Sequence, residues 1–326
     1  MFLSLDRNYI ESGDSVIALT TDCRALSNDI AATRTSEAVA GLMTLGVDRL
    51  FLKIDSTMRG SVKGQVAGAL AAWGSRHPDA HAFVCPAYPA MGRTVESNLV
   101  LVRGVPVERT AFGQDPVTPV TTSDMALLLP ASPTIRVSDA RTDSDLIKIA
   151  SLIASAGPAA IAVGSGGLAG ALAGKWSDSG RTPSDKSERT ISRKKNPRVL
   201  FQLSSLNPVS QAQVARLIAV FPDVVVVRGP AERGNSTAVA EALADAFAER
   251  VERGQWDFLG LIGGDGARQS LARLGASGVR IVDSLLEGIP LGIVAGGKAD
   301  GMPVFTKAGG FGDEDALVRC VERMTV

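Results

Sequence analysis

The sequence is poor in the residue types that mark metal sites, disulfide frameworks and redox centres. It has three cysteines and two histidines in 326 residues. Cys23, Cys85 and Cys320 lack the spacing of a metal site or a disulfide framework, so we expect small buried side chains rather than ligands or nucleophiles. His77 and His81 flank a proline in a predicted loop, and we assign neither of them a catalytic role.

Excess charge and long apolar runs are also lacking. Lys plus Arg and Asp plus Glu each number 34, so no overall field favours nucleic acid or a membrane surface. The composition, 45% hydrophobic and 21% charged, is that of a globular protein, and no apolar run is long enough to span a bilayer. Residues 1–14 are acidic where a signal peptide would have a basic flank and an apolar core. These absences predict a cytoplasmic protein with no nucleic-acid or membrane partner.

Strand and helix patterns alternate along most of the chain. Short apolar runs such as 50–54 are followed by segments with helical periodicity such as 62–73. This alternation predicts an α/β fold with two α/β domains and mostly parallel sheets. Residues 177–197 are polar, contain glycine and proline, and are nearly free of large apolar side chains, which is typical of a linker. We therefore predict domains at 1–176 and 198–326, joined by this linker.

A glycine-rich turn follows the apolar run 258–262. Gly263, Gly264 and Gly266 separate this predicted strand from a helix expected at 267–274. A strand that leads through glycines into a helix leaves backbone N–H groups unpaired at the positive end of the helix dipole. That geometry binds phosphate, and a tight turn without a ligand is the alternative.

Two further loops have the same position between a strand and a helix. Residues 307–312, KAGGFG, lie between a predicted strand at 302–306 and a predicted helix at 313–324, and Ser204 and Ser205 follow another predicted strand. In an open α/β sheet such loops converge at the carboxyl ends of the strands, where ligands bind. The C-terminal domain is therefore predicted to contain a nucleotide pocket.

Two polar loops follow predicted strands in the N-terminal domain. Residues 53–60, KIDSTMRG, carry two cations, a carboxylate and two hydroxyls, and residues 86–94 add a proline frame, a glycine and Arg93. The planar fork of arginine suits bidentate binding of a carboxylate. Arg59 and Arg93 therefore predict a small anionic substrate, whose hydroxyls the polar side chains at 55–57 would bind.

Structural ion pairs are the alternative explanation of these charges. Lys53 could pair with Asp55, and Arg59 could pair with Asp115. Either loop alone is compatible with both explanations.

Several short motifs occur in one order along the chain: KIDSTMRG, PAYPAMGRT, VGSGGLA, IGGDGA and KAGGFGDEDAL. Together they resemble the four-carbon acid sugar kinase family, which includes 3-oxo-tetronate, D-threonate and D-erythronate kinases. The resemblance extends from about residue 20 to residue 323. It implies an N-terminal domain that binds the acid sugar and a C-terminal domain that binds ATP. The substrate site implied in this way consists of Lys53, Asp55, Ser56, Arg59, Gly92 and Arg93. The implied nucleotide site consists of Ser205, Gly263, Gly264, Asp265, Gly266, Gly309 and Gly310.

The resemblance also implies the reaction. Such a kinase transfers the γ-phosphoryl group of ATP, with Mg²⁺, to a hydroxyl of a four-carbon sugar acid bound in the cleft between the domains. Asp55 and Arg59 would be catalytic, Arg59 and Arg93 would bind the substrate carboxylate, and no protein metal ligands are predicted. The sequence does not identify the tetronate or the phosphorylated hydroxyl, and for the oligomeric state it is compatible with a homodimer.

Three departures from the family pattern bear on activity. The family begins with a strand ending in an Asp-Asp-Leu-Thr-Gly-like motif that supplies carboxylates, and nothing before Asp22 matches it. The family's Gly-Gly-Asp-Thr is Gly-Gly-Asp-Gly at 263–266, and its Gly-Ser is Ser-Ser at 204–205.

Phosphoryl transfer needs a residue that orients the attacking hydroxyl, so the first departure leaves three alternatives open. Asp22 or Asp55 takes over that role, the gene start is truncated, or the protein is a catalytically impaired homologue that binds nucleotide or sugar acid. A dinucleotide-dependent dehydrogenase is disfavoured because no G-x-G-x-x-G follows an early strand.

Overall fold

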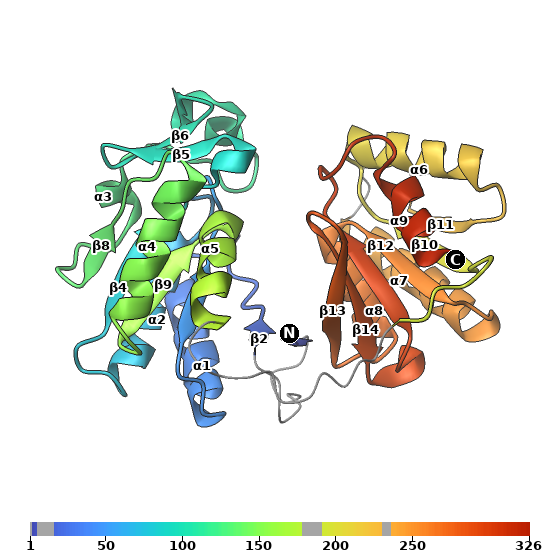
Figure 1. Ribbon diagram of the computed structural model, residues 1–326, viewed down its shortest axis with the longest axis horizontal. Coiled ribbons are helices and arrows are strands. Elements are labelled where there is room, and N and C mark those ends of the chain that lie inside the picture. Colours follow the sequence, from blue (N-terminus) through green and yellow to red (C-terminus); the bar gives the residue numbers. More distant parts are fainter. Residues whose placement is uncertain (1, 5–15, 178–190, 230–235) are drawn as a thin grey trace. The chain divides into compact units, whose positions relative to one another are not determined.

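The structure is a computed structural model that describes residues 2–4, 16–177, 191–229 and 236–326. The chain forms two compact units (Figure 1). We call residues 21–186 the N-terminal unit, and residues 187–326 together with 1–20 the C-terminal unit. Most of the predicted linker, residues 178–190, lies outside the described residues, so the predicted domain boundaries stay a prediction.

The N-terminal unit is built on a parallel four-stranded sheet with strand order β3-β9-β4-β8. The strands are β3 (Leu50–Lys53), β4 (His81–Cys85), β8 (Ile135–Val137) and β9 (Ala160–Gly164). The helices are α1 (Asn28–Thr44), α2 (Val62–Gly74), α3 (Met125–Leu128), α4 (Asp143–Ser155) and α5 (Gly166–Ser177). Helices α1 and α2 pack together, as do α4 and α5.

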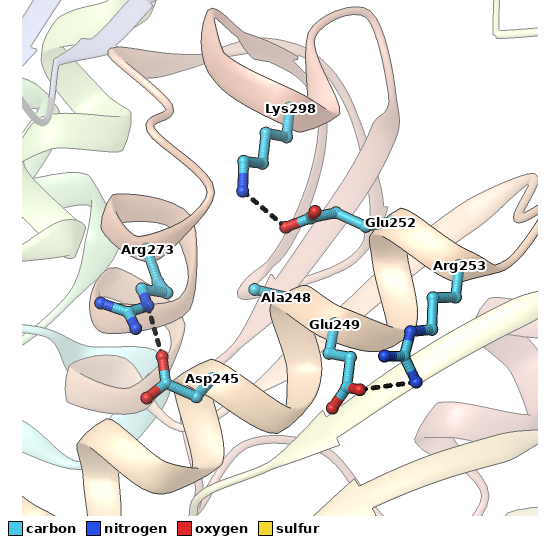
Figure 2. Close-up of a pocket in the computed structure, with 7 residues that line it drawn as sticks. All are labelled: Asp245, Ala248, Glu249, Glu252, Arg253, Arg273 and Lys298. Atoms are coloured by element: carbon cyan, nitrogen blue, oxygen red, sulfur yellow. Dashed lines mark hydrogen bonds and ion pairs between the residues drawn. The ribbon is translucent and has the colours of Figure 1, made fainter.

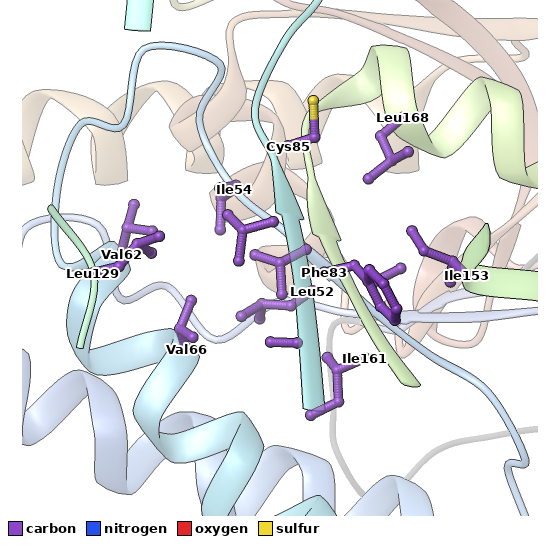
Figure 3. Close-up of a cluster of buried hydrophobic side chains, with 14 of the residues drawn as sticks. Leu52, Ile54, Val62, Val66, Phe83, Cys85, Leu129, Ile153, Ile161 and Leu168 are labelled. Atoms are coloured by element: carbon purple, nitrogen blue, oxygen red, sulfur yellow. The ribbon is translucent and has the colours of Figure 1, made fainter. Parts of the chain in front are cut away.

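The two helix pairs cover opposite faces of this sheet. The connection from β3 through α2 to β4 and the connection from β8 through α4 to β9 run in opposite directions across the sheet. Because such crossovers are right-handed, α2 and α4 lie on opposite faces. The strands are consequently buried on both faces, and their side chains form one apolar cluster with both helix layers (Figure 3). Trp73 at the end of α2 is fully buried, and its indole N–H donates to the carbonyl of Pro158 at 2.8 Å.

A small antiparallel sheet follows β4. It consists of β5 (Arg93–Glu96), β6 (Leu99–Val102) and β7 (Val105–Pro106). Short 3₁₀ turns flank it: η1 (Pro89–Met91), η2 (Val107–Arg109) and η3 (Ala111–Gln114). This segment, which the sequence predicted only as loops and short strands, contributes side chains to the site described below.

The C-terminal unit has an eight-stranded sheet with strand order β11-β10-β12-β15-β14-β13-β1-β2. Its strands are β1 (Phe2–Ser4), β2 (Ile17–Leu19), β10 (Val199–Leu203), β11 (Val225–Arg228), β12 (Phe258–Ile262), β13 (Gly278–Leu286), β14 (Ile289–Ala295) and β15 (Pro303–Lys307). Strands β11, β10, β12 and β15 are parallel, whereas β14 and β13 are antiparallel to their neighbours. The helices are α6 (Pro208–Val220), α7 (Ser236–Arg253), α8 (Gly264–Arg273) and α9 (Ala316–Met324), with a 3₁₀ turn η4 (Gly297–Ala299).

The strand order of this sheet reverses between β10 and β12. From β10 the chain passes through α6 outward to β11, and from β11 it returns through α7 to β12 on the other side of β10. Right-handed connections therefore place α6 and α7 on opposite faces, where α6 packs with α9 and α7 packs with α8. The carboxyl ends of β10 and β12 form the switch point, at which open α/β sheets bind ligands.

The structure confirms the two-domain α/β fold with mostly parallel sheets and corrects some element bounds. The helix predicted at 267–274 begins earlier, at Gly264, so two of the loop glycines lie within its first turn. The helix predicted at 313–324 begins later, at Ala316. Strands β13 and β14 form an antiparallel hairpin through Glu287 and Gly288, which the sequence analysis did not predict.

Two glycines in the α1–α2 pair provide a test of this packing. A Cβ at Gly68 would lie 2.2 Å from the carbonyl oxygen of Ala32, whereas a Cβ at Gly41 would meet nothing within 4 Å. Gly68→Ala should therefore separate the helices and lower the free energy of unfolding by about 1–3 kcal/mol. Gly41→Ala should raise it by about 0.5–1 kcal/mol, because alanine has the higher helix propensity. Urea denaturation of both variants measures the difference, and equal effects would contradict the close approach.

Candidate functional site

The polar loops of the N-terminal unit lie at the carboxyl ends of neighbouring strands. After β3, the N–H of Ile54 donates to the carbonyl of Gly164 at 2.9 Å, which fixes the loop that follows Lys53 to the end of β9. The Oγ of Ser165 then donates to the carbonyl of Ala87 at 2.8 Å, which fixes the end of β9 to the loop after β4. The three loops therefore form one surface at the same edge of the sheet.

Arg59 lies between two carboxylates at this surface. Its Nη2 and Nε donate to the Asp55 carboxylate at 3.0 and 3.4 Å, and its Nη1 donates to Asp115 at 3.1 Å. The ion pair between Arg59 and Asp115, which the sequence offered as the structural alternative, is present. Three of the five guanidinium N–H groups are used in this way, so two remain for a ligand.

Hydrogen bonds at this surface lower the pKa values of both carboxylates, Asp55 and Asp115. Burial raises the pKa of Asp55, but hydrogen bonds from Arg59 and Thr57 outweigh it and hold that pKa below its usual value. The backbone N–H groups of Thr118 and Val117, together with Arg59, lower the pKa of Asp115 to about 2. Both carboxylates are consequently ionised at neutral pH and fix the orientation of the guanidinium.

Arg93 forms no ion pair with a carboxylate of the described residues. Its Nη1 donates to the carbonyl of Met91, and its buried Nε has no hydrogen-bond partner among the described residues. The guanidinium carbon lies 5.6 Å from the ring centroid of Phe112, and that of Arg59 lies 4.8 Å from the same centroid. Burial and the charge of Arg103 lower the pKa of Arg93. A cation beside other cations, with an unsatisfied buried donor, is a site for an anion.

Arg103 is a cation near this site that the sequence analysis did not identify. It has a positive φ of 51° in the turn between β6 and β7, its N–H donates to the carbonyl of Gly92 at 2.7 Å, and its side chain is exposed. A Cβ at Gly92 would lie 3.0 Å from the Arg103 Cγ, so glycine allows the two segments to meet. Arg103 and Gly104 both have positive φ, as a two-residue hairpin turn requires, but an Arg-Gly pair is not a strong hairpin signal in a sequence.

Four arginines and two aspartates make up this charged cluster. The fourth arginine is Arg24, whose Nη2 lies 3.9 Å from Asp115. Four guanidinium groups against the two carboxylates of Asp55 and Asp115 leave a net charge of +2, which favours a substrate with negative charge. Of the other predicted residues, Lys53 is exposed at the end of β3 and Ser56 is half-buried in the following loop.

The segment that contains Asp22 lies against the same loop. The Oγ of Ser61 donates to the carbonyl of Cys23 at 2.6 Å, and a Cβ at Gly60 would lie 2.4 Å from the carbonyl oxygen of Arg24. Asp22 itself is exposed and has a positive φ of 52°. The structure therefore brings the chain next to Asp22 to the loop that carries Asp55 and Arg59.

In the C-terminal unit, the glycines after β12 allow a close approach to the loop after β10. Gly263 has a φ of 115°, and a Cβ there would lie 2.2 Å from the Oγ of Ser204. A Cβ at Gly266 would lie 2.2 Å from the Ser204 Cβ. The Oγ of Ser204 donates to the carbonyl of Ile262 at 3.0 Å, so the end of β12 and the loop after β10 are bound together. Residues with a Cβ at 263 or 266 would separate them.

Gly264 differs from its neighbours because its missing side chain faces open space. It is the first residue of α8, followed by Asp265, and nothing lies within 4 Å of a Cβ placed there. The first N–H groups of a helix have no intrahelical partners and carry the positive end of the dipole. Helix α8 therefore begins at an open position that suits an anion.

The loop after β15 lies beside the loop after β10. A Cβ at Gly309 would lie 2.4 Å from the Oγ of Ser205, and a Cβ at Gly310 would lie 3.5 Å from the Nδ2 of Asn207. The N–H of Gly263 donates to the carbonyl of Lys307 at 2.9 Å, so the loop after β15 is also bound to the loop after β12. Three loops thus meet at the switch point. Of the residues predicted for the nucleotide site, Ser205, Gly263, Gly309 and Gly310 lie in these loops. The others, Gly264, Asp265 and Gly266, lie in the first turn of α8.

No group of three or more His, Cys, Asp or Glu side chains in the described ranges could hold a metal ion. In the same part of the chain no helix is long and apolar enough to cross a membrane.

A surface depression on α7 and α8 is a different feature (Figure 2). Its lining residues are Asp245, Ala248, Glu249, Glu252, Arg253, Arg273 and Lys298. Each of the three cations among them forms an ion pair with a carboxylate of the same lining. Arg273 is the last residue of α8, whereas the glycine-rich loop after β12 leads into its first residue, Gly264. The depression thus lies at the far end of the helix and has no unpaired charge for a ligand.

The low pKa of Asp115 predicts how acid affects the fold. Because that pKa is about 2 against an ordinary value of 3.8, the charged form stabilises the fold above pH 3.8, and this contribution is lost as pH falls toward 2. Asp115→Asn should lower the free energy of unfolding at neutral pH by about 1 kcal/mol, after allowance for solvent screening. The difference from wild type should shrink on acidification through that window. Thermal unfolding at several pH values measures it, and a constant difference would contradict the assignment.

Comparison with known protein families agrees with the division of roles between the two units. Residues 1–134 match the model of a sugar-binding N-terminal domain, and residues 223–317 match the model of a nucleotide-binding C-terminal domain. The first range contains the arginine cluster, and the second contains the loops after β12 and β15.

Individual proteins resemble the chain over almost its full length. A D-threonate kinase from Bordetella bronchiseptica is 34% identical, in an alignment covering 94% of this chain and 85% of the relative. A D-erythronate kinase from Heliobacterium modesticaldum is 26% identical, covering 98% of this chain and 90% of the relative. The crystal structure of a Haemophilus influenzae protein shares the fold, with a TM-score of 0.75 at 16% identity, over 99% of this chain and 93% of that one. The chain therefore belongs to the four-carbon acid sugar kinase family.

Proposed function

We propose that the protein is an ATP-dependent kinase that phosphorylates a hydroxyl of a four-carbon sugar acid. The relatives named D-threonate and D-erythronate kinase support a sugar-acid kinase. The observation that carries the proposal is the pairing of two anion sites of different kinds, one in each unit. The first is an arginine cluster with a net positive charge, and the second is a set of glycine loops at a switch point.

The arginine cluster suits the carboxylate of a short acid. Arg93 is the principal ligand in this proposal, because its guanidinium has no carboxylate partner among the described residues and its Nε is unsatisfied. Arg59 contributes its two remaining N–H groups, and Arg103 adds positive charge. The predicted roles of Asp55 and Arg59 in catalysis, and of Lys53, Ser56 and Gly92 in substrate binding, stay part of the proposal.

The C-terminal loops suit the phosphates of ATP. The open first turn of α8 at Gly264 and the loop at Gly309 and Gly310 would hold phosphate oxygens through main-chain N–H groups. ATP supplies the phosphoryl group, and Mg²⁺ characteristically binds one or two carboxylates together with substrate phosphates. These main-chain N–H groups would stabilise the negative charge that develops on the phosphate oxygens in the transition state, and this stabilisation needs no proton transfer from a side chain.

The residue that orients the attacking hydroxyl is the open part of the proposal. Both carboxylate oxygens of Asp55 accept hydrogen bonds from Arg59 or Thr57, so we propose that Asp55 contributes to catalysis by orienting Arg59. Asp22 is exposed beside the same loop, which keeps it as the candidate from the sequence. A homologue that binds nucleotide or sugar acid without efficient catalysis, the alternative from the sequence analysis, stays the second candidate function.

The direct test is ADP release from Mg-ATP with D-threonate, D-erythronate and 3-oxo-tetronates. We expect turnover with at least one acid. Gly264→Val should abolish it and weaken Mg-ATP binding at least about tenfold, because the side chain fills open space beside the α8 N-terminus. The melting temperature should stay within about 2 °C, since no described atom lies in the way. ATP binding without turnover on any acid would favour the second candidate, and undiminished affinity in the variant would exclude this loop.

Arg93→Ala tests the acid site. The variant should raise the KM for the sugar acid by about tenfold to a hundredfold, because a charge-assisted contact is lost, while the KM for ATP stays unchanged. Arg136→Ala is a matched control, since Arg136 also lies over an aromatic ring, that of Phe83 at 5.7 Å, but on a different strand. Steady-state kinetics and thermal unfolding separate the outcomes. A lowered melting temperature with unaltered kinetics would make Arg93 structural.

A further inference from the structure

Lys307 is a buried lysine that neither the sequence analysis nor the comparisons assign to a role. It is the last residue of β15, and its side chain is 2% exposed. Lysine is almost never fully buried unless it is paired. The salt bridges among the described residues include none to Lys307, and burial lowers its pKa. The cost of burying this cation must therefore be offset by other contacts.

The ammonium group makes those contacts with the loop that follows. Its Nζ donates to the carbonyl oxygen of Ala308 at 2.9 Å and to that of Gly309 at 3.1 Å. The Oγ of Ser210, from the first turn of α6, donates to the same Gly309 carbonyl at 2.6 Å. Two successive carbonyls of the loop are thus fixed toward the interior.

Peptide geometry then determines where the corresponding N–H groups point. In a trans peptide the C=O and the N–H point in opposite directions, and the chain has no cis peptide bond among the described residues. The carbonyls of Ala308 and Gly309 belong to the peptides whose N–H groups are on Gly309 and Gly310. Both N–H groups therefore point away from Lys307, and neither donates a hydrogen bond to a described residue.

The loop presents these N–H groups at the switch point. Gly309 lies against Ser205, since a Cβ on it would be 2.4 Å from the Ser205 Oγ. The Lys307 carbonyl accepts from the N–H of Gly263 at 2.9 Å, directly before α8. A side chain at position 309 would displace Ser205, so the short distance requires glycine there.

We propose that Lys307 is a positioning residue of the nucleotide site, and that it aims the main-chain N–H groups of Gly309 and Gly310 at a phosphate group of the bound nucleotide. This inference deepens the proposed function and rests on it. Its positive charge, buried without a carboxylate among the described residues, is complementary to the polyphosphate. Two of the three ammonium donors of Lys307 hold carbonyls of its own loop, so in this proposal Lys307 acts on the ligand through that loop.

The test is Lys307→Met, which keeps the length and apolar stem of the side chain and removes the ammonium. We expect its affinity for Mg-ADP, measured by calorimetry, to fall by about tenfold to a hundredfold. The KM for the sugar acid should be unchanged. The melting temperature should be unchanged or higher, because replacing a buried charge by an apolar group is often neutral or stabilising. Unchanged Mg-ADP affinity, with or without a lower melting temperature, would overturn the proposal.

A second variant and a control keep the outcome clear. Lys307→Gln retains one amide donor group and should recover part of the lost affinity; it also replaces the Met variant if that variant fails to fold. Lys298→Met removes a surface lysine that pairs with Glu252 at 2.7 Å and should leave the affinity unaltered. If wild-type protein binds no Mg-ADP, the proposed function fails; if it binds and both Lys307 variants bind equally well, only this inference fails.

Amide signals provide a readout that a purely structural role would not move. In a ¹⁵N-labelled sample, titration with Mg-ADP should shift the N–H signals of Gly309 and Gly310 in wild type. In Lys307→Met the same shifts should be smaller at equal occupancy. Shifts confined to Gly264 and its neighbours, with none in the loop after β15, would contradict the assignment.

Discussion

The close approach of Ser204 to the first turn of α8 is the constraint on which the C-terminal unit depends. A Cβ at Gly263 or Gly266 would lie 2.2 Å from an atom of Ser204. Only glycine at these two positions therefore allows the loop after β12 to contact the loop after β10. The reversal of strand order places this contact between β10 and β12. Backbone topology and the absence of two side chains together bring the first turn of α8 and the loop after β10 to one place, where the first N–H groups of the helix have no intrahelical partners.

In the proposed function each unit binds an anion, and the two units would do so with different groups. The N-terminal unit gathers guanidinium groups and fixes one of them with Asp55 and Asp115, whose pKa values are lowered by the contact. In the proposed function the C-terminal unit would use main-chain N–H groups, with the buried cation of Lys307 behind the loop. Planar forks suit a carboxylate, whereas several convergent N–H groups suit the larger and more symmetric phosphate. This difference agrees with the matches to a sugar-binding and a nucleotide-binding domain.

Much of the fold could be predicted from local pattern, because strands buried on both faces are continuous apolar runs. Residues 258–262 are the clearest case, since the predicted strand and β12 coincide. The start of α8 was predicted too late, because Gly264 and Gly266 disfavour a helix locally, and the close approach to Ser204 requires glycine at 266. The β13–β14 hairpin was missed because its turn at Glu287 and Gly288 is one residue pair without a strong signal.

For the candidate site, too, the local sequence pattern locates the loops but not the long-range contacts between them. The loops that carry Arg59 and Gly264 could be located by their position between strand and helix, and the structure brings the members of each set together. Arg103 could not be found, because nothing local shows that its hairpin folds onto Gly92. The burial of Lys307 was not predicted. Its hydrogen-bond partners are main-chain carbonyls of its own loop, and these are not visible in the order of side chains along the sequence.

The three cysteines have a practical consequence. Cys23, Cys85 and Cys320 are free and buried, and burial raises the pKa of Cys85 to about 11 and that of Cys320 to about 12. The thiols of Cys85 and Cys320 are therefore almost entirely protonated at neutral pH, and only the thiolate is a strong nucleophile. Because all three cysteines are buried, the native sequence should react little with maleimides. A single introduced cysteine in each unit could carry a fluorophore, so that the separation of the units can be followed in solution as ligands are added.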